Sequence, residues 1–345
     1  MRPVCVFSLA AALGAIALLP ACAGNSPGSS SLVPSSTAFL AASRPGERGR
    51  PLTGCSGERR AQQEMAHSQP VKAEKGVAEL YVLDICEPSI DVFNAKTYRE
   101  LGSIASGLDQ PDDLFVDRKG NLYVSNETLD GDVTEYTSGE PIFTYSANMG
   151  RPYVVTTDAK GDVYEGDTYN GYINEYSQHQ NNGTVASCQP VADGNDAVVG
   201  LAVDSHNDVF AEINDTDTFS YELVEYPGGL TGCPSPAVLP LPTADMAGYP
   251  MAIDKNGNLL IPVLGSVEVV DGPSYSTVNA TIGSGFQCAA NVTLNRANTL
   301  AYVTDECNDT VTVVNYPSGT NVTVLGSGNG LTDPQAAVAS LNAVY

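Results

Sequence analysis

One turn recurs along the chain at intervals of similar length, and this repetition restricts the fold more than any other feature. Each copy follows a short apolar stretch and closes with Gly, Asn or Asp, and the opening residues are Asp117, Asp158, Asp204, Asp254 and Asn295. Successive copies are separated by 41, 46, 50 and 41 residues. A side-chain oxygen that opens such a turn accepts hydrogen bonds from the amides ahead of it, and Gly or Asn near its end adopts positive φ easily. We therefore predict structural rather than catalytic roles for these five residues.

Two further strands follow each turn, and a weaker strand completes the unit. In the first copy these strands cover 122–124, 133–136 and 142–145. Polar and apolar residues alternate in the third strand of each unit, and a period of two indicates half-buried antiparallel strands. Four strands in a unit of about 40 to 50 residues are typical of a β-propeller blade.

The chain holds five complete units and two fragments. Residues 80–104 supply three strands with no first strand before them, and residues 334–339 form a first strand with little chain after it. Together the fragments complete a sixth blade, which closes the ring and removes its open edges. We predict an all-β, six-bladed propeller with four-stranded blades over 77–345, closed by N- and C-terminal strands that share one blade. We expect a monomer.

The residues that mark the blades resemble two known repeats. The stretch 301–305 (Ala-Tyr-Val-Thr-Asp), with 310–315 after it, resembles the YVTN repeat, and 122–126 (Leu-Tyr-Val-Ser-Asn), preceded by 117–121, resembles the NHL repeat. The resemblance is loose, but it covers nearly the whole of 77–345. It implies an architecture and not an activity, because families with such rings include metal-dependent lactonases, streptogramin lyases and secreted or surface binding proteins.

The N-terminus predicts export. Arg2 and the apolar run 4–19 are typical of a secretory signal, and the run is short for a membrane span. The sequence 19–22 (Leu-Pro-Ala-Cys) resembles the lipobox of bacterial lipoproteins. This resemblance implies a signal peptide over 1–22, cleavage before Cys22 and lipidation of that residue, so that the membrane is reached through the lipid alone. The alternative is an ordinary secreted protein in which Cys22 is incidental.

The residue after the lipobox cysteine is Ala23 rather than Asp. By the same resemblance, we expect a place in the bacterial cell envelope, with the outer membrane or cell surface favoured. Residues 23–76 combine a stretch rich in Ser, Pro, Gly and Ala with a stretch that lacks apolar periodicity, and such a composition predicts a flexible tether.

Charge is distributed unevenly. The chain has 16 Lys and Arg against 40 Asp and Glu, a formal net charge of −24. Residues 1–76 hold 8 basic and 4 acidic residues (+4), which leaves 8 and 36 (−28) for residues 77–345. An acidic ring excludes nucleic-acid binding through phosphate contacts and favours a cation or a partner with a basic surface.

The cysteines suggest disulfides. Without Cys5 and Cys22, six remain, and an even number in an exported chain favours disulfide pairing. The hairpin around 295–299 sets Cys288 opposite Cys307. Cys188 and Cys233 lie late in successive units and could join their outer edges, which leaves Cys55 of the tether for Cys86. Some of these cysteines could instead be free thiols.

Polar residues are expected at one mouth of the channel. In a propeller, the starts of first strands and the ends of second strands meet there. Those positions hold Asp84, Asp112, Asp113, Asn126, Glu127, Tyr153, Asp167, Asn214, Asp215, Asp305 and Glu306. All of these except Asp113 and Tyr153 are candidate ligands for Ca²⁺ or another divalent cation, because hard cations prefer oxygen ligands. The alternative is a solvated acidic rim whose side chains cap turns.

No complete catalytic set is recognisable. Streptogramin lyases need His, and His67, His179 and His206 all lie away from the mouth in this reading. Lactonases with this fold use Glu, Asn and Asp on a divalent metal, and the mouth has these residue types. Our leading hypothesis is a non-catalytic binding scaffold for a protein, glycan or small ligand, with no cofactor required. The alternative is a metal-dependent lactonase or lyase-like enzyme that uses the acidic mouth.

Overall fold

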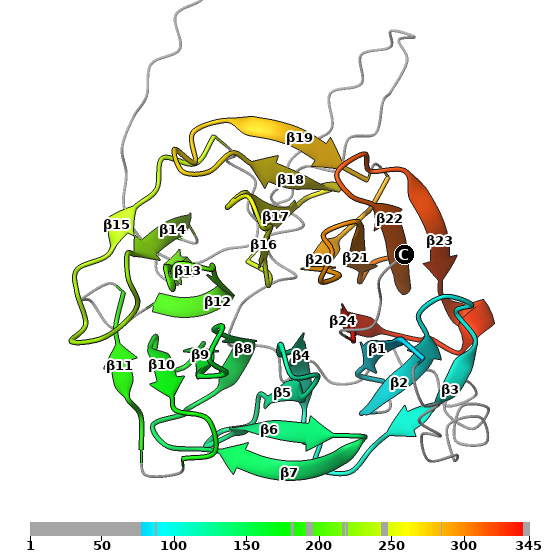
Figure 1. Cartoon of the computed structure of the whole chain (residues 1–345), viewed down its shortest axis with the longest axis horizontal. Helices are drawn as coiled ribbons and strands as arrows, with labels where there is room; N and C mark the ends of the chain where they lie inside the picture. Colours follow the sequence, from blue (N-terminus) through cyan, green and yellow to red (C-terminus); the bar gives the residue numbers. More distant parts are fainter. Residues whose placement is uncertain are drawn as a thin grey trace, which may run out of the picture. The chain divides into compact units, whose positions relative to one another are not determined.

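The computed structural model describes residues 77–340 except 87, 181–182, 191–195, 216–217, 219, 243–247 and 284. Within these residues, 24 strands form six antiparallel sheets of four strands. The sheets are arranged as the blades of a ring around a common axis (Figure 1). The predicted six-bladed propeller is confirmed. Blade 1 is the blade that contains both ends of the described chain, and blades 2 to 6 follow in chain order.

The blades have the following strands, from the channel outward. Blade 1 holds β24 (Pro334–Ala339), β1 (Glu79–Asp84), β2 (Ser89–Asn94) and β3 (Glu100–Ile104). Blade 2 holds β4 (Pro111–Val116), β5 (Leu122–Asn126), β6 (Asp132–Thr137) and β7 (Glu140–Tyr145). Blade 3 holds β8 (Pro152–Thr157), β9 (Val163–Asp167), β10 (Ile173–Tyr176) and β11 (Ala186–Cys188). Blade 4 holds β12 (Asp196–Val203), β13 (Val209–Asp215), β14 (Ser220–Tyr226) and β15 (Ala237–Val238). Blade 5 holds β16 (Ala252–Ile253), β17 (Leu259–Val263), β18 (Ser266–Val270) and β19 (Val278–Ile282). Blade 6 holds β20 (Ala289–Leu294), β21 (Leu300–Asp305), β22 (Thr310–Asn315) and β23 (Asn321–Leu325), and the 3-10 turn η1 (Ser327–Asn329) follows it.

Blade 1 closes the ring as predicted. β24 pairs antiparallel with β1, with Leu80 opposite Ala339 and Val82 opposite Ala337. The pairing extends one residue further, because Ser340 donates its backbone amide to the Glu79 carbonyl at 2.8 Å. The first and last described strands therefore lie side by side (Figure 1).

The recurring turn has the predicted structural role. Asp117 Oδ1 accepts the backbone amides of Lys119 and Asn121 at 2.8 Å each. Equivalent bonds are made by Asp158, Asp204, Asp254 and Asn295. In blades 2 to 6 this turn joins the first strand to the second, whereas the first two strands of blade 1 come from opposite ends of the described chain.

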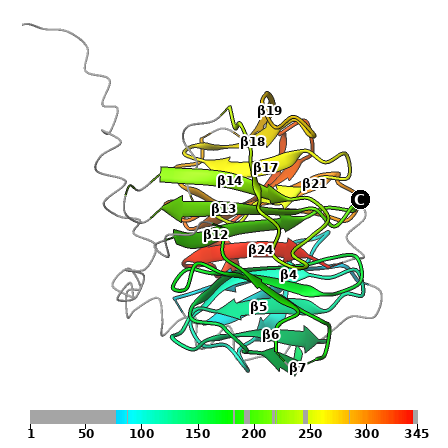
Figure 2. The same ribbon diagram turned by 90° about the vertical axis from the view of Figure 1, so that its left-hand side faces the viewer.

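The strands run between two faces of the ring (Figure 2). We call one face the turn end: it carries the turns between first and second strands and those between third and fourth strands. The other face, the loop end, carries the loops between second and third strands and the connections from each blade to the next.

Apolar side chains between neighbouring blades make the core. Between blades 3 and 4, Val154 and Tyr164 pack with Val198 and Leu201, and all four are buried. Burial of such side chains contributes about 1.5–3 kcal/mol each. The core therefore holds the blades face to face and leaves the first strands around the channel.

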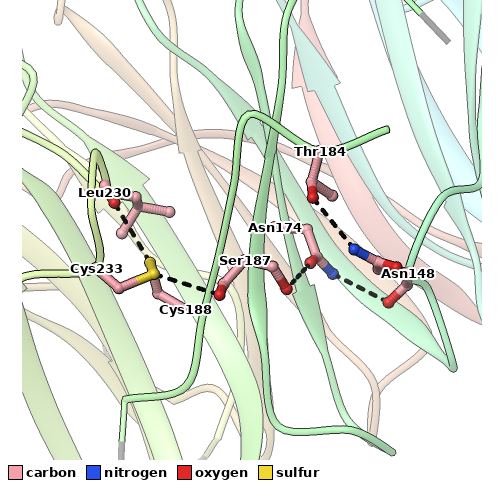
Figure 3. The surroundings of a disulfide bond; sticks show 7 residues. All are labelled: Asn148, Asn174, Thr184, Ser187, Cys188, Leu230 and Cys233. Atoms are coloured by element: carbon pink, nitrogen blue, oxygen red, sulfur yellow. Dashed lines mark hydrogen bonds between the residues drawn. A yellow bond between two sulfur atoms is a disulfide. The ribbon is translucent and has the colours of Figure 1, made fainter. Parts of the chain in front are cut away.

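Two predicted disulfides are confirmed. Cys188, at the end of β11, is bonded to Cys233 of the loop after β14, with a Cα–Cα distance of 5.3 Å (Figure 3). This bridge joins the outer edges of blades 3 and 4. Cys288 and Cys307 are bonded within blade 6, also with a Cα–Cα distance of 5.3 Å. For the third predicted pair, Cys86 is described and Cys55 lies outside the described residues.

Several predictions concern the N-terminal part of the chain. The signal peptide over 1–22, the lipidated Cys22 and the tether over 23–76 all lie outside the described residues. Among the residues that are described, no helix has the length and apolar character needed to cross a membrane.

Candidate functional site: the two ends of the channel

Asp84 is buried at the loop end and binds the connection between blades 6 and 1. Its carboxylate accepts the backbone amides of Thr332 at 2.6 Å and Asp333 at 3.3 Å, together with the Thr332 hydroxyl at 2.9 Å. It also accepts the amide of Cys86 at 3.2 Å. This carboxylate holds the C-terminal strand against the N-terminal one.

Asp167 and Asp305 occupy the same position at the ends of β9 and β21. Asp167 accepts amides from both sides, including those of Arg151 at 3.2 Å and Tyr169 at 2.7 Å. Asp305 accepts the amides of Gln287 at 2.9 Å and Cys288 at 3.0 Å. Each side chain therefore caps the connection that arrives from the preceding blade.

Asn126, at the end of β5, does the same with an amide in place of a carboxylate. Its Oδ1 accepts the amide of Asp109 at 3.0 Å, and its Nδ2 donates to Asp132 Oδ1 at 2.7 Å. In four of the six blades, therefore, the last residue of the second strand is a buried cap. These four oxygen-bearing side chains point at protein amides.

The other predicted ligands lie around these caps. Glu127 Oε1 accepts the Thr168 hydroxyl at 3.2 Å, and Glu306 Oε2 accepts the Tyr249 hydroxyl at 2.9 Å. Asp215 accepts the amide of Thr218 at 3.0 Å. The remaining two predicted ligands are Asp112, which is half-buried, and Asn214, which is buried.

The predicted metal site at this end stays a prediction. In the part of the chain that the structure describes, the one set of three acidic, His or Cys side chains with ligand atoms within 4.8 Å of one another is Asp204, His206 and Asp208. That set lies in a turn of blade 4 at the opposite end. Its Asp204 already accepts the amides of His206 and Asp208 at 2.8 Å each.

Three buried carboxyl groups lie inside strands rather than at the mouth. Burial raises the pKa of Asp113 to about 7 and that of Glu212 to about 8, although each accepts at least one backbone amide. Burial, followed by the charge of Asp167, raises the pKa of Glu165 well above its usual value. Sequence reasoning placed Asp113 at the mouth and missed the other two. Their signal is an acidic residue in the middle of an otherwise apolar second strand.

The channel contains a cavity of about 520 Å³ that opens at the turn end. Its walls come from the first strands of all six blades, at 113–116, 155–156, 201–203, 252–253, 291–294 and 338–339. The turns after β4, β12, β16 and β20 surround its opening. The cavity therefore opens on the face opposite to the one where the sequence predicted ligands.

Basic residues are concentrated on that same face. The ring has eight Lys and Arg residues. Seven of them lie in turns of the turn end: Lys96, Arg99, Arg118, Lys119, Lys160, Lys255 and Arg296. The eighth, Arg151, lies at the loop end.

The loop end also exposes apolar side chains. Leu129 is 63% exposed and Tyr169 is 65% exposed, in loops of the adjacent blades 2 and 3, and Leu264 is 51% exposed in blade 5. The loop end is thus acidic with exposed apolar groups, and the turn end carries nearly all the cations and the cavity.

The ring of six four-stranded antiparallel sheets makes this chain a β-propeller protein. No protein-family model matches the chain, and no curated protein matches it. The chain is similar to one in the crystal structure of a nidogen/laminin complex, with a TM-score of 0.58, 12% identity, and coverage of 77% of this chain and 99% of that one. It is equally similar to a protein of unknown function from Bacteroides caccae, with a TM-score of 0.58, 11% identity, and coverage of 76% and 99%. At these identities the likeness shows the fold alone.

Proposed function

We propose that this chain is an exported, lipid-anchored β-propeller that acts as a non-catalytic binding scaffold, and that its loop end binds a protein partner with a basic, partly apolar surface. A propeller fold is compatible with such a role. One solved propeller of similar fold occurs in a nidogen/laminin complex, which is an assembly of two proteins.

The observation that carries the proposal is the composition of the loop end. Its exposed or half-buried acidic residues are Asp109, Asp112, Asp130, Asp132, Asp215, Glu306, Asp309 and Asp333. Exposed Leu129 and Tyr169 lie among them. Apolar anchors inside a charged rim are typical of protein interfaces, and the rim charge selects a partner of opposite sign.

The inner carboxylates support a scaffold rather than an enzyme. Asp84, Asp167 and Asp305 each bind several amides, so removing these bonds to coordinate a substrate or metal would open the connections between blades. Carboxylates that already accept several backbone amides are suited to holding the loops in place for a partner.

The test uses an amphipathic peptide of alternating Lys and Leu as the probe. The double variant Asp109→Lys/Tyr169→Ala removes one exposed acid and one exposed apolar group from the loop end. We expect it to weaken binding about tenfold, measured by fluorescence anisotropy, because both groups would contact the peptide.

The matched control is Glu140→Lys/Ile142→Ala on β7, which makes the same change of charge and also truncates an exposed apolar side chain, at positions away from the loop end. It should change the affinity less than twofold. If both double variants lose affinity equally, the peptide responds to net charge, and the loop end is not the binding surface.

The lipid anchor has a separate test. Cys22→Ala should move the protein from the membrane fraction to the soluble fraction of the expressing bacterium and abolish labelling by radioactive palmitate. A variant that stays in the membrane fraction would show that the anchor lies elsewhere.

A further inference from the structure

We propose that the channel cavity at the turn end is a second binding site, which takes a small organic anion with an apolar body. The acidic group of the ligand would lie against Arg118, Lys255 and Arg296, and a hydrogen-bond donor at its other end would meet Asn291. This site lies on the face opposite to the proposed protein surface and does not depend on it.

Three cations surround the opening of the cavity. Arg118, Lys255 and Arg296 line it and are exposed. They follow β4, β16 and β20 of blades 2, 5 and 6, and β4 lies across the ring from β16 and β20 (Figure 1). None of the three side chains forms an ion pair with a carboxylate of the described residues. In a ring with eight basic residues, three cations at one opening provide an anion-binding group.

The neighbouring carboxylates do not cancel these cations through contact. Asp117 and Asp254 precede Arg118 and Lys255 in the chain, but their oxygens are directed into their own turns. Asp117 accepts the amide of Asn121 and Asp254 that of Asn258, and Asp254 Oδ2 also accepts the Tyr316 hydroxyl at 2.8 Å. At the equivalent place before Arg296, the chain has the neutral Asn295.

The inner end of the cavity has an acceptor that lacks a donor. Asn291 is 1% exposed and donates its Nδ2 to Asp113 Oδ1 at 3.0 Å. Its Oδ1 is buried without a hydrogen-bond partner. A buried acceptor left unpaired costs about 1–3 kcal/mol, so a ligand hydroxyl or N–H at this place would gain a bond that the protein alone does not make.

The dimensions suit a molecule of moderate size. A cavity of about 520 Å³ lies within the range of small-molecule sites. Four residue steps along β4 separate Asp113 from Asp117, which at about 3.3 Å per residue places the inner end about 13 Å from the opening. Between them the lining includes Leu114, Val292 and Ile253, which would contact an apolar body.

The low charge of the inner end also favours an anion. Burial raises the pKa of Asp113 to about 7, so a large share of this carboxyl is protonated at neutral pH. An anionic ligand therefore meets cations at the opening and a largely neutral group inside.

The probe for this site is 1-anilinonaphthalene-8-sulfonate, which combines a sulfonate, an apolar ring system and an N–H donor. The protein is the chain from residue 23 onward, which keeps every described residue. We expect saturable fluorescence enhancement, and an affinity about tenfold lower in Arg118→Gln/Lys255→Gln/Arg296→Gln. Thermal unfolding of both proteins verifies that the substitutions leave the fold intact.

The matched control is Lys96→Gln/Arg99→Gln/Lys160→Gln, which removes the same charge from turn-end residues outside the cavity lining. It should change the affinity less than twofold. The uncharged analogue N-phenyl-1-naphthylamine should bind both triple variants and the parent equally. The proposal is overturned if the parent does not bind the sulfonate, if both triple variants lose affinity alike, or if the cavity variant binds as tightly as the parent.

Discussion

Aspartates at both ends of the ring accept hydrogen bonds from backbone amides, but these amides lie at very different distances along the chain. At the turn end, Asp117 and Asp158 bind amides two to four residues ahead of them. At the loop end, Asp167 and Asp305 bind amides 16 to 18 residues away, and Asp84 binds residues 248 and 249 positions away. The same chemistry thus shapes a hairpin at one face and joins blades at the other.

This difference decides what each aspartate contributes to stability. An aspartate that caps its own turn replaces water as the acceptor for amides that are already close to it in the chain. A long-range cap also resists the separation of two blades, because its partners belong to a different blade or to the connection that arrives from one. Its loss leaves several amides without partners in a place that water reaches poorly.

The largest expected effect follows from Asp84→Ala. The substitution removes the acceptor for three backbone amides and one hydroxyl at the closure of the ring. We expect the free energy of unfolding to fall by about 3–5 kcal/mol, measured by urea denaturation. Limited proteolysis should cut near β24 first, because the closing strand loses its anchor.

The matched control is Asp158→Ala at the turn end. Asp158 also accepts three amides, those of Lys160, Gly161 and Asp162, but residues 159 and 160 are exposed. Water can solvate part of this turn, so the loss should be about 1–2 kcal/mol. Equal losses in the two variants would show that the range of a cap along the chain does not matter.

The change of folding stability with pH also differs between two aspartates, and this effect is smaller than that of Asp84→Ala. In Asp254 of the turn end, burial alone would raise the pKa, but bonds from Asn258, Tyr316 and Asn256 lower it. In Asp113 of the channel, burial outweighs the bonds from Val155 and Asn291 and raises the pKa to about 7. Stability contributed by Asp254 is therefore lost as pH falls, whereas the folded state holds the Asp113 proton and loses stability as pH rises from about 4 to 7.

Asp113→Asn isolates this second contribution. Relative to the parent, the variant should gain about 2–3 kcal/mol of unfolding free energy between pH 5 and pH 7.5, since only the parent has to ionise the buried group. Urea denaturation across that range measures the gain. A constant difference at all pH values would contradict the raised pKa.

The sequence predicted the fold well because its signals are local. The period of two, the Asp-led turns and the hairpin register require only neighbouring residues, and they led to six blades and the Cys288–Cys307 bridge. The shared blade was predictable because residues 80–104 supply three strands without a first strand, and residues 334–339 supply a first strand without the other three.

The candidate site was less predictable because its partners are distant in the chain. Nothing near Asp84 in the sequence indicates Thr332, so an aspartate at a strand end is indistinguishable from a metal ligand until the blades are assembled. The cavity is harder still, since each of its six walls is a short apolar strand like any other. The cations in the turns after β4, β16 and β20 were its one visible signal.

The pairing of β1 with β24 has a consequence for the order of events during synthesis. About 250 residues separate the two strands, and a ribosome adds about 5–20 residues per second, so β1 waits roughly 10 to 50 seconds for its neighbour. During that interval blade 1 lacks its innermost strand and the ring stays open. The ring is therefore completed only after the C-terminal strand has been made, however early the other five blades form.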